Sequence, residues 1–282
     1  MSTTTRAFKQ VDVFTADALK GNPVAVILDA EGLTAADMQA IASWTNLSET
    51  TFVIPATDGQ ADYAVRIFTP KSELPFAGHP TLGTAHAVIE AGLATPSDGT
   101  LVQQCAVGLV EVSVAGTGLS FRLPRYAFEE APEPERLVAA LGDAAIVGAP
   151  RIVDVGPRWV IVQLSSAAAV ERLQPDLPAL ADYDRAYATT GLTVFGERAD
   201  GGIVVRSFAP ADGVPEDPVC GSGNGAVAAY RLKSGQIAAG SAYTASQGRQ
   251  VGRDGHVRVA IVGDAVHVGG DCVTVVDGTF RI

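Results

Sequence analysis

The sequence contains no run of about 20 consecutive apolar residues, which is the length that a helix needs to cross a bilayer. It also lacks a basic amphipathic stretch, so we expect no helix that spans or lies on a membrane. Basic side chains number 20 against 31 acidic ones, which gives a formal net charge of −11. Because this charge repels phosphate backbones, nucleic acid is not an expected partner. The first ten residues, MSTTTRAFKQ, lack the apolar core of a secretory signal, so a cytoplasmic location is expected.

Cysteine is also scarce. The three cysteines, Cys105, Cys220 and Cys272, are odd in number and widely spaced. This pattern argues against a disulfide framework, and no two of them have the spacing of a zinc knuckle, so no metal site is expected. Apolar residues make up 47% of the 282 residues and charged residues 18%. A chain of this length and composition is expected to fold into one large or two medium domains.

The sequence repeats itself. The segment Arg66-Ile-Phe-Thr-Pro70 recurs as Arg206-Ser-Phe-Ala-Pro210, at an offset of 206 − 66 = 140 residues, and a glycine-rich segment follows each copy. A third match pairs Gln104 with Gln247, at a slightly larger offset. Three matches in the same order at a nearly constant offset indicate an internal repeat, in which the two halves of the chain share one structure.

Each half is expected to contain a strand, a glycine-rich turn and then a helix of small residues. Glycines inside these helices, such as Gly83 and Gly225, are unfavourable in an exposed helix but suit a helix that is packed closely on all sides. A helix threaded through a curled antiparallel sheet meets this condition. The helices are expected over residues 79–91 and 222–233, and the strands over residues 21–27, 51–54, 63–68, 109–114, 119–123, 158–164, 203–208, 257–262 and 272–276.

These patterns predict an α+β fold of two pseudo-symmetric domains, each an antiparallel sheet or barrel wrapped round a central helix. The first domain should comprise residues 1–126, completed by the C-terminal strand 270–282, and the second residues 127–269. The stretch 127–134 is rich in proline and glutamate and has no periodic pattern, so it is expected to be the interdomain linker.

A surface helix is expected over residues 35–44. Thr34 and Asp37 have the spacing of a capping box, which marks the start of a helix. Met38, Ile41 and Trp44 recur at helical spacing and predict its apolar face.

The two glycine-rich turns each open a helix. A helix N-terminus presents unpaired N–H groups and a partial positive charge, so it binds anions. Gly78, Gly221 and Ser222 would supply backbone donors, and Ser222 a hydroxyl as well. Two such helix ends facing each other across an interdomain cleft could hold a small carboxylate and stabilise negative charge formed on it. The glycines could instead only permit tight turns, but the doubled pattern favours a binding site.

Titratable side chains accompany these turns. His79 begins an apolar helix, where an imidazolium is disfavoured, so a neutral ring able to donate or accept a proton is expected. Glu49 lies between the surface helix and a strand, and desolvation there would raise the pKa of its carboxyl and make it a general acid or base. Asp217 precedes the second turn. Each could instead be structural: a surface histidine, an exposed loop glutamate, and an aspartate that caps its own loop.

Cys220 immediately precedes Gly221 at the start of the second helix. A helix N-terminus lowers the pKa of a thiol and makes it reactive, so Cys220 is a candidate catalytic group. Cys105 and Cys272 lie in strand patterns and are expected to be buried, small apolar side chains.

The segments around these residues resemble the PhzF-like family of phenazine biosynthesis over nearly the whole chain. The matching segments include Asn46-Leu-Ser-Glu-Thr50, Phe76-Ala-Gly-His-Pro80 and Glu216-Asp-Pro-Val-Cys-Gly-Ser222. The resemblance implies the fold of diaminopimelate epimerase, with the active site between two similar domains. It also implies proton transfer without a cofactor, and a homodimer.

The resemblance further implies roles for individual residues. Glu49 would take a proton from carbon and return it elsewhere. His79, Asp217 and Ser222 would hold the substrate and relay protons. The main hypothesis is therefore a cofactor-independent isomerase acting on a small carboxylated substrate.

One position departs from the family pattern. The family usually has threonine where this chain has Cys220, which resembles the second thiol of the epimerases and proline racemases. The position that matches the first thiol is Ala77, which disfavours a racemase with two thiols. An epimerase or racemase that uses Cys220 with Glu49 remains open, and so does a binding protein that has lost the chemistry.

Overall fold

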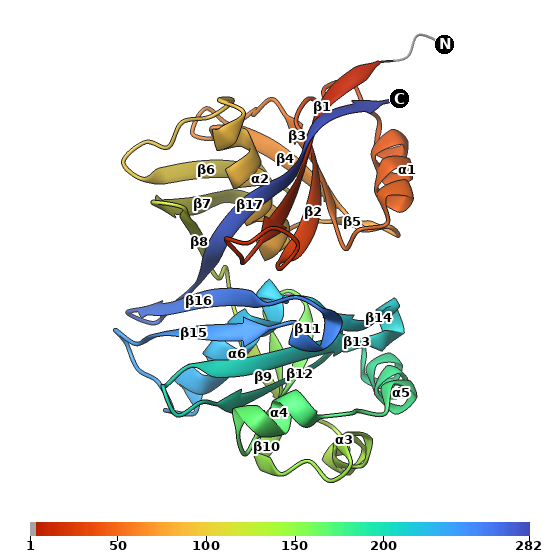
Figure 1. The fold of residues 1–282 in the computed structure, drawn as a ribbon, viewed down its shortest axis with the longest axis vertical. Helices are drawn as coiled ribbons and strands as arrows, with labels where there is room; N and C mark the ends of the chain where they lie inside the picture. The colour runs from red at the N-terminus through yellow and green to blue at the C-terminus, as the bar shows by residue number, and fades with distance from the viewer. Residues whose placement is uncertain (1–3) are drawn as a thin grey trace. The chain divides into compact units, whose positions relative to one another are not determined.

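The computed structural model describes residues 4–282, which divide into two compact units (Figure 1). The first unit comprises the described residues up to Phe121 together with Gly269–Ile282, and the second unit comprises Arg122–Val268. The boundary predicted after residue 126 lies slightly beyond this division. No helix formed by residues 4–282 is both long and apolar enough to cross a bilayer.

The main strands of the first unit form a closed ring. Around the ring, β17 pairs with β1, β1 with β2, β2 with β3, β3 with β4, β4 with β6, β6 with β7, β7 with β8, and β8 again with β17. The pairs β2–β3 and β4–β6 are parallel, and helices α1 and α2 make the crossovers that parallel pairs require. The elements are β1 (Thr5–Val13), β2 (Asn22–Ile27), α1 (Ala35–Thr45), β3 (Thr50–Ile54), β4 (Tyr63–Phe68), β5 (Glu73–Leu74), α2 (Gly78–Glu90), β6 (Thr100–Cys105), β7 (Gly108–Ala115), β8 (Gly118–Arg122) and β17 (Ala265–Arg281).

Helix α2 is the central helix of the first unit. All its residues from Gly78 to Ala85 are buried. A Cβ atom added at Gly83 would lie 2.3 Å from Cγ1 of Val24 on β2, so the helix approaches the strand more closely than any other residue allows. The prediction of a small-residue helix enclosed by a sheet is confirmed for this unit.

The second unit repeats this topology. Strand β9 pairs with β10, β10 with β11, β12 with β13 and β15 with β16, all antiparallel, while β11–β12 and β13–β15 are parallel. The central helix is α6, which is again mostly buried. The elements are β9 (Ala127–Glu130), α3 (Pro134–Leu141), β10 (Ile146–Asp154), β11 (Arg158–Leu164), α4 (Ala167–Arg172), α5 (Leu177–Tyr187), β12 (Gly191–Glu197), β13 (Ile203–Ala209), the short 3₁₀ helix Pro210–Asp212, β14 (Val214–Asp217), α6 (Gly221–Lys233), β15 (Ala242–Gln247), the 3₁₀ helix Arg249–Val251 and β16 (Gly255–Val262).

The predicted linker 127–134 is wrong. Its first four residues form β9, which pairs with Arg151–Asp154 of β10, and Pro134 begins helix α3. Two of the glutamates that made this stretch look like a linker form ion pairs with neighbouring strands, such as Glu130 with Arg151 at 2.9 Å. Strand pairing therefore outweighs the local composition.

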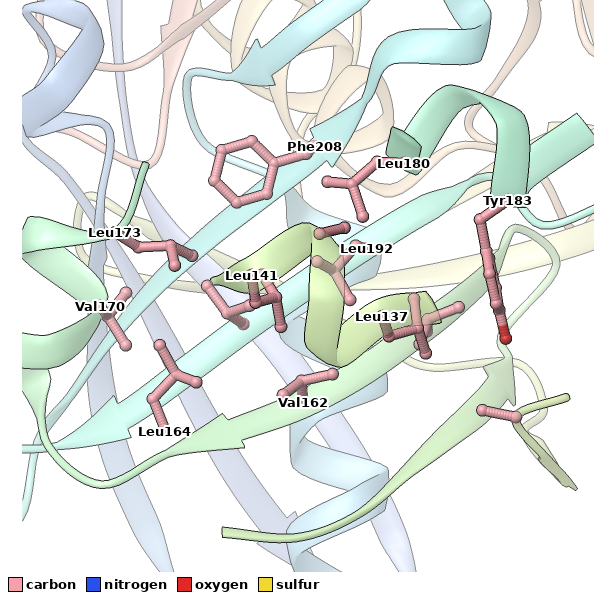
Figure 2. Close-up of a cluster of buried hydrophobic side chains, with 14 of the residues drawn as sticks. Leu137, Leu141, Val162, Leu164, Val170, Leu173, Leu180, Tyr183, Leu192 and Phe208 are labelled. Carbon is pink, nitrogen blue, oxygen red and sulfur yellow. The ribbon is translucent and has the colours of Figure 1, made fainter. Parts of the chain in front are cut away.

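Three helices cover one face of β11, β12 and β13 in the second unit. Figure 2 shows side chains of α3, α4 and α5 packed against side chains of these strands. The labelled members of this cluster are Leu137, Leu141, Val162, Leu164, Val170, Leu173, Leu180, Tyr183, Leu192 and Phe208. Side chains pack on both faces of β11, β12 and β13. These strands are therefore held in place, and they fix the position of the residues at the start of α6.

Helix α1 has the predicted capping box, in which the Thr34 side chain and Asp37 each bond the backbone of the other. Met38 and Ile41 are buried, as expected. Trp44 is not: its ring meets Phe280 edge-on and remains 77% exposed.

Candidate active site

Glu49 and His79 are in direct contact in the first unit. Glu49 immediately precedes β3, and its backbone carbonyl accepts a hydrogen bond from the amide of Ala25 on β2. His79 is the second residue of α2. Its Nδ1 atom lies 3.3 Å from Oε2 of Glu49, and both side chains are largely buried. The structure therefore brings two of the predicted catalytic residues together.

The imidazole of His79 is neutral at physiological pH. Burial lowers its pKa from 6.5 to about 4, although a hydrogen bond with the backbone of Pro23 acts in the opposite direction. A neutral ring was predicted from the helix N-terminus, but the main cause is loss of solvent. A neutral imidazole can donate from one nitrogen and accept at the other, so His79 can form hydrogen bonds beside Glu49 without carrying a charge.

Gly78 begins α2 where the helix meets an aromatic ring. A Cβ atom at this position would lie 2.5 Å from the ring of Phe121, which accounts for the glycine. The residue before it, Ala77, has an extended backbone and makes no side-chain bond to the helix. The start of α2 is therefore not capped by the side chain that precedes it, and its amides keep the donor capacity that suits an anion.

A network of buried polar side chains holds α2 in place. Thr84 donates to the Thr51 hydroxyl at 2.8 Å, and Gln103 donates to the Thr81 hydroxyl at 3.0 Å. These bonds tie the first turns of the helix to β3 and β6, and so help to fix His79 relative to Glu49. The two threonines within the otherwise apolar segment 80–85 are the sequence signal from which this network could have been predicted.

The pairing of Gln104 with Gln247 in the sequence repeat is out of register with the structure. Gln104 bonds Thr57 at the surface, whereas the buried glutamine of β6 is its neighbour Gln103. Neighbouring residues of a strand point to opposite faces, so an error of one position moves a side chain from the interior to the surface.

The other predicted site residues gather at the start of α6 in the second unit. Cys220 caps the helix: its Sγ atom accepts a hydrogen bond from the Gly223 amide at 3.2 Å and lies 3.6 Å from the Ser222 hydroxyl. Gly221 is the first residue of the helix. Asp217 ends β14, and its Oδ1 atom accepts a hydrogen bond from the amide of Val219 at 3.0 Å.

Burial sets the protonation of Asp217 and Cys220. It raises the pKa of Asp217 to about 6, while hydrogen bonds from the Val219 amide and the Cys220 thiol oppose the change. Burial also raises the pKa of Cys220, and the charge of Asp217 adds to this effect. The predicted lowering of the Cys220 pKa is therefore wrong, because desolvation outweighs the field of the helix N-terminus. At neutral pH Cys220 is a protonated thiol.

Three further hydrogen bonds hold this turn. Asn224 of α6 donates to the Gln247 side chain at 2.9 Å, and Gln247 donates to the backbone carbonyl of Asp217 at 3.0 Å. Trp159 of β11 donates its indole N–H to the Ser222 hydroxyl at 3.0 Å. The bonds from Gln247 to Asp217 and from Trp159 to Ser222 were not predicted, because Gln247 and Trp159 come from strands that are distant in the sequence.

A buried arginine anchors the strand that carries Asp217. Arg206 forms two parallel hydrogen bonds with Glu216, and it also donates to the backbone carbonyls of Val170 and Leu173. In the first unit, Arg66 pairs with Glu73 in the same bidentate manner. The repeated Arg-x-Phe-x-Pro motif thus marks the same clamp in both units.

The remaining thiols lie outside these clusters. Cys105 is partly buried and Cys272 is buried, and none of the three cysteines, all of which lie in the described part of the chain, forms a disulfide. Among residues 4–282, no three side chains of His, Cys, Asp or Glu gather as a set that could ligate a metal ion.

Comparisons with known proteins match nearly the whole chain to a single family. Residues 11–278 match the PhzC-PhzF family model, described as phenazine biosynthesis-like protein. The chain is 41% identical to antisense-enhancing sequence 1 of Schizosaccharomyces pombe, covering 98% of each chain. It is 36% identical to trans-2,3-dihydro-3-hydroxyanthranilate isomerase of Pseudomonas aeruginosa, over 95% of this chain and 96% of that protein. A crystal structure of a PhzF-family protein from Bacillus anthracis matches with a TM-score of 0.85 and 25% identity, covering 99% of each chain.

Proposed function

Because this chain belongs to the PhzC-PhzF family of phenazine biosynthesis-like proteins, we propose that it is an isomerase that moves a proton on a small carboxylated substrate without a cofactor. The relative named trans-2,3-dihydro-3-hydroxyanthranilate isomerase supports the reaction class. The contact between Glu49 and His79 is the observation that carries the proposal, because it places a carboxylate beside a neutral imidazole in a largely buried position.

Glu49 is the proton-transfer group in this proposal. It takes a proton from a substrate carbon and returns it to another carbon of the same conjugated system. The imidazole of His79, whose Nδ1 lies 3.3 Å from Oε2 of Glu49, would pack beside the carboxyl group and help to hold it in place. When Glu49 takes the proton from the substrate carbon, its carboxylate becomes neutral and the negative charge passes to the substrate, so the total charge of the site does not change.

The residues at the start of α6 would act on the same substrate. Asp217 can give or take a proton near neutral pH, because its pKa is about 6. The Ser222 hydroxyl and the amides at Gly78 and Gly221 would bind the substrate carboxylate. They would also stabilise the negative charge that spreads into it when the proton leaves carbon.

The substitution Glu49→Gln tests the central role. It keeps the size of the side chain and removes its basicity. We expect it to abolish incorporation of solvent deuterium into trans-2,3-dihydro-3-hydroxyanthranilate, measured by mass spectrometry, while leaving the affinity for this compound. Glu31→Gln, which makes the same change at an exposed loop position, is the control and should exchange at the wild-type rate. Undiminished exchange by Glu49→Gln would refute the role of Glu49.

The alternative of an epimerase that uses Cys220 with Glu49 is less well supported. A base on the second face of the substrate carbon would have to be a thiolate, and burial raises the pKa of Cys220. A binding protein without activity is the other alternative. It would hold a ligand but never exchange a carbon-bound proton, so the deuterium measurement separates it from the isomerase.

A further inference from the structure

We propose that Trp159 is a positioning residue of this site: its indole N–H binds the oxygen of Ser222 and so directs the serine proton toward the substrate. The inference rests on the proposed function, in which Ser222 contacts the substrate carboxylate. It adds the residue that fills one acceptor position of Ser222 and leaves the serine proton available to the substrate.

The direction of the hydrogen bond follows from the two groups. An indole nitrogen has one proton and no lone pair to offer, so it only donates. The distance of 3.0 Å between Nε1 of Trp159 and Oγ of Ser222 therefore means that the serine oxygen accepts. A hydroxyl has one proton and two acceptor positions, so the proton of Ser222 remains for another acceptor.

Two acceptors can compete for this proton. The Sγ atom of Cys220 lies 3.6 Å from Oγ, and a thiol sulfur is a weak acceptor. A carboxylate oxygen is a much stronger acceptor, because the hydrogen bond is then assisted by charge. A bound carboxylate would thus draw the Ser222 proton away from the sulfur, whereas a ligand group that can only donate would use the second acceptor position of Ser222 and leave its proton on the sulfur.

The indole of Trp159 is held firmly. Trp159 lies in β11 between Val153 of β10 and Gly191 of β12, and its side chain is buried. A Cβ atom added at Gly191 would lie 2.9 Å from the indole ring, so the ring fills the space above that glycine. A buried N–H without a partner is costly, which means that Trp159 and Ser222 constrain each other.

The tryptophan content allows a direct test of this hydrogen bond. The chain has two tryptophans, and Trp44 is 77% exposed. In ¹⁵N-labelled protein, the two indole N–H signals can be assigned from Trp44→Phe and Trp159→Phe. We expect the Trp159 signal to exchange slowly with solvent and to shift in Ser222→Ala, and the Trp44 signal to do neither. A Trp159 signal unchanged in Ser222→Ala would overturn the proposal.

Binding of a small carboxylate tests whether the Ser222 proton is available to a ligand. Benzoate is the carboxylate probe, and benzamide is its neutral counterpart. In the wild-type protein, benzoate should shift the Trp159 indole signal and benzamide should shift it less at the same concentration. This measurement needs no variant and does not depend on folding of a substituted protein. Equal shifts for both probes, or no shift with benzoate, would overturn the proposal.

A double-mutant comparison separates positioning from packing. Trp159→Phe keeps an aromatic ring and removes the N–H, and we expect it to weaken benzoate binding about tenfold. Ser222→Ala should weaken it by a similar factor, and the double variant should be no weaker than Ser222→Ala alone, because both changes remove one interaction. Additive losses would show that Trp159 acts only through packing and would overturn the proposal. None of these readouts requires turnover, so their failure is distinguishable from failure of the Glu49→Gln exchange test.

Discussion

Arg206 binds Glu216 through two hydrogen bonds of 2.9 and 2.8 Å, and this pair is far more buried than its counterpart in the first unit. The side chains of Arg206 and Glu216 are 4% and 10% exposed, whereas those of Arg66 and Glu73 are 30% and 39% exposed. Removing one partner of a buried ion pair leaves a charge without compensation, whereas an exposed pair is compensated by water. Breaking the Arg206–Glu216 pair should therefore cost more free energy of unfolding than breaking the Arg66–Glu73 pair, although the two pairs share one geometry.

Arg206→Ala should lower the free energy of unfolding by about 3–5 kcal/mol, because Glu216 would remain charged and buried. Arg66→Ala is the matched control and should cost no more than about 1 kcal/mol. Urea unfolding followed by circular dichroism measures both. Equal costs for the two substitutions would contradict the assignment of the Arg206 clamp as the stronger support of the strand that carries Asp217.

The raised pKa of Asp217 predicts a stability that depends on pH. Its pKa is 3.8 in the unfolded chain and about 6 in the folded protein, so between these values the folded state binds more protons. The contribution of Asp217 to stability therefore falls as the pH rises from about 4 to about 6. Asp217→Asn should raise the free energy of unfolding by about 2 kcal/mol at pH 7.5 and change it little at pH 3.5.

Asp184 provides the control for this prediction. It is a buried carboxyl on α5 whose pKa is also raised to about 6, chiefly by burial. Asp184→Asn should give a similar gain in stability at pH 7.5 without loss of proton exchange. Asp217→Asn should stabilise the protein and reduce exchange, since groups that serve function are often unfavourable for folding. Full activity of Asp217→Asn would contradict a role for this carboxyl in proton transfer.

The protonated state of Cys220 predicts that a hydroxyl can replace its thiol. Cys220→Ser keeps an acceptor for the Gly223 amide and a donor for Asp217, so it should retain deuterium exchange within about tenfold of the wild type. Cys220→Val removes both and should cost about 1 kcal/mol of stability, as loss of an N-cap side chain does. An epimerase that relies on a thiolate would instead lose all activity in Cys220→Ser, which the same mass-spectrometric assay would reveal.

The tight approach at Gly83 predicts a strong effect of a single methyl group. Gly83→Ala improves the intrinsic helix propensity but places a Cβ atom 2.3 Å from Val24, so the side chains must move apart. We expect a loss of about 1–3 kcal/mol in the free energy of unfolding. Gly92→Ala is not a suitable comparison, because φ is positive at Gly92. Gly59→Ala, where nothing lies within 4 Å, should change stability little.

Much of the fold could be predicted from the sequence because the two units repeat the same pattern. The glycine-rich helices and the family resemblance follow from spacing that is visible along the chain, and the family and the α+β fold class are confirmed. The sheets were predicted to be antiparallel, but each is mixed, because β2–β3, β4–β6, β11–β12 and β13–β15 are parallel pairs. The capping box at Thr34 depends on neighbouring residues alone, and it too is present. Local patterns of this kind survive folding because no distant contact competes with them.

The site was harder to predict where distant residues set its properties. The pKa of Cys220 depends on how deeply the tertiary structure buries it, and the partner of Ser222 comes from a strand 63 residues earlier in the chain. Register within β6 was lost because Gln103 and Gln104 differ only in the face of the strand to which they point. The catalytic roles of Glu49, His79, Asp217 and Cys220, and the binding roles of Gly78, Gly221 and Ser222, stay predictions for the experiments above.

Strand β17 has a consequence for the order of folding during synthesis. It closes the ring of the first unit by pairing with both β1 and β8, yet it is translated after the whole of the second unit. During synthesis, the second unit would therefore be complete while β1 and β8 of the first unit still lack the strand that pairs with both. Exposed strand edges attract other chains, so the nascent protein depends on β17 to remove that hazard.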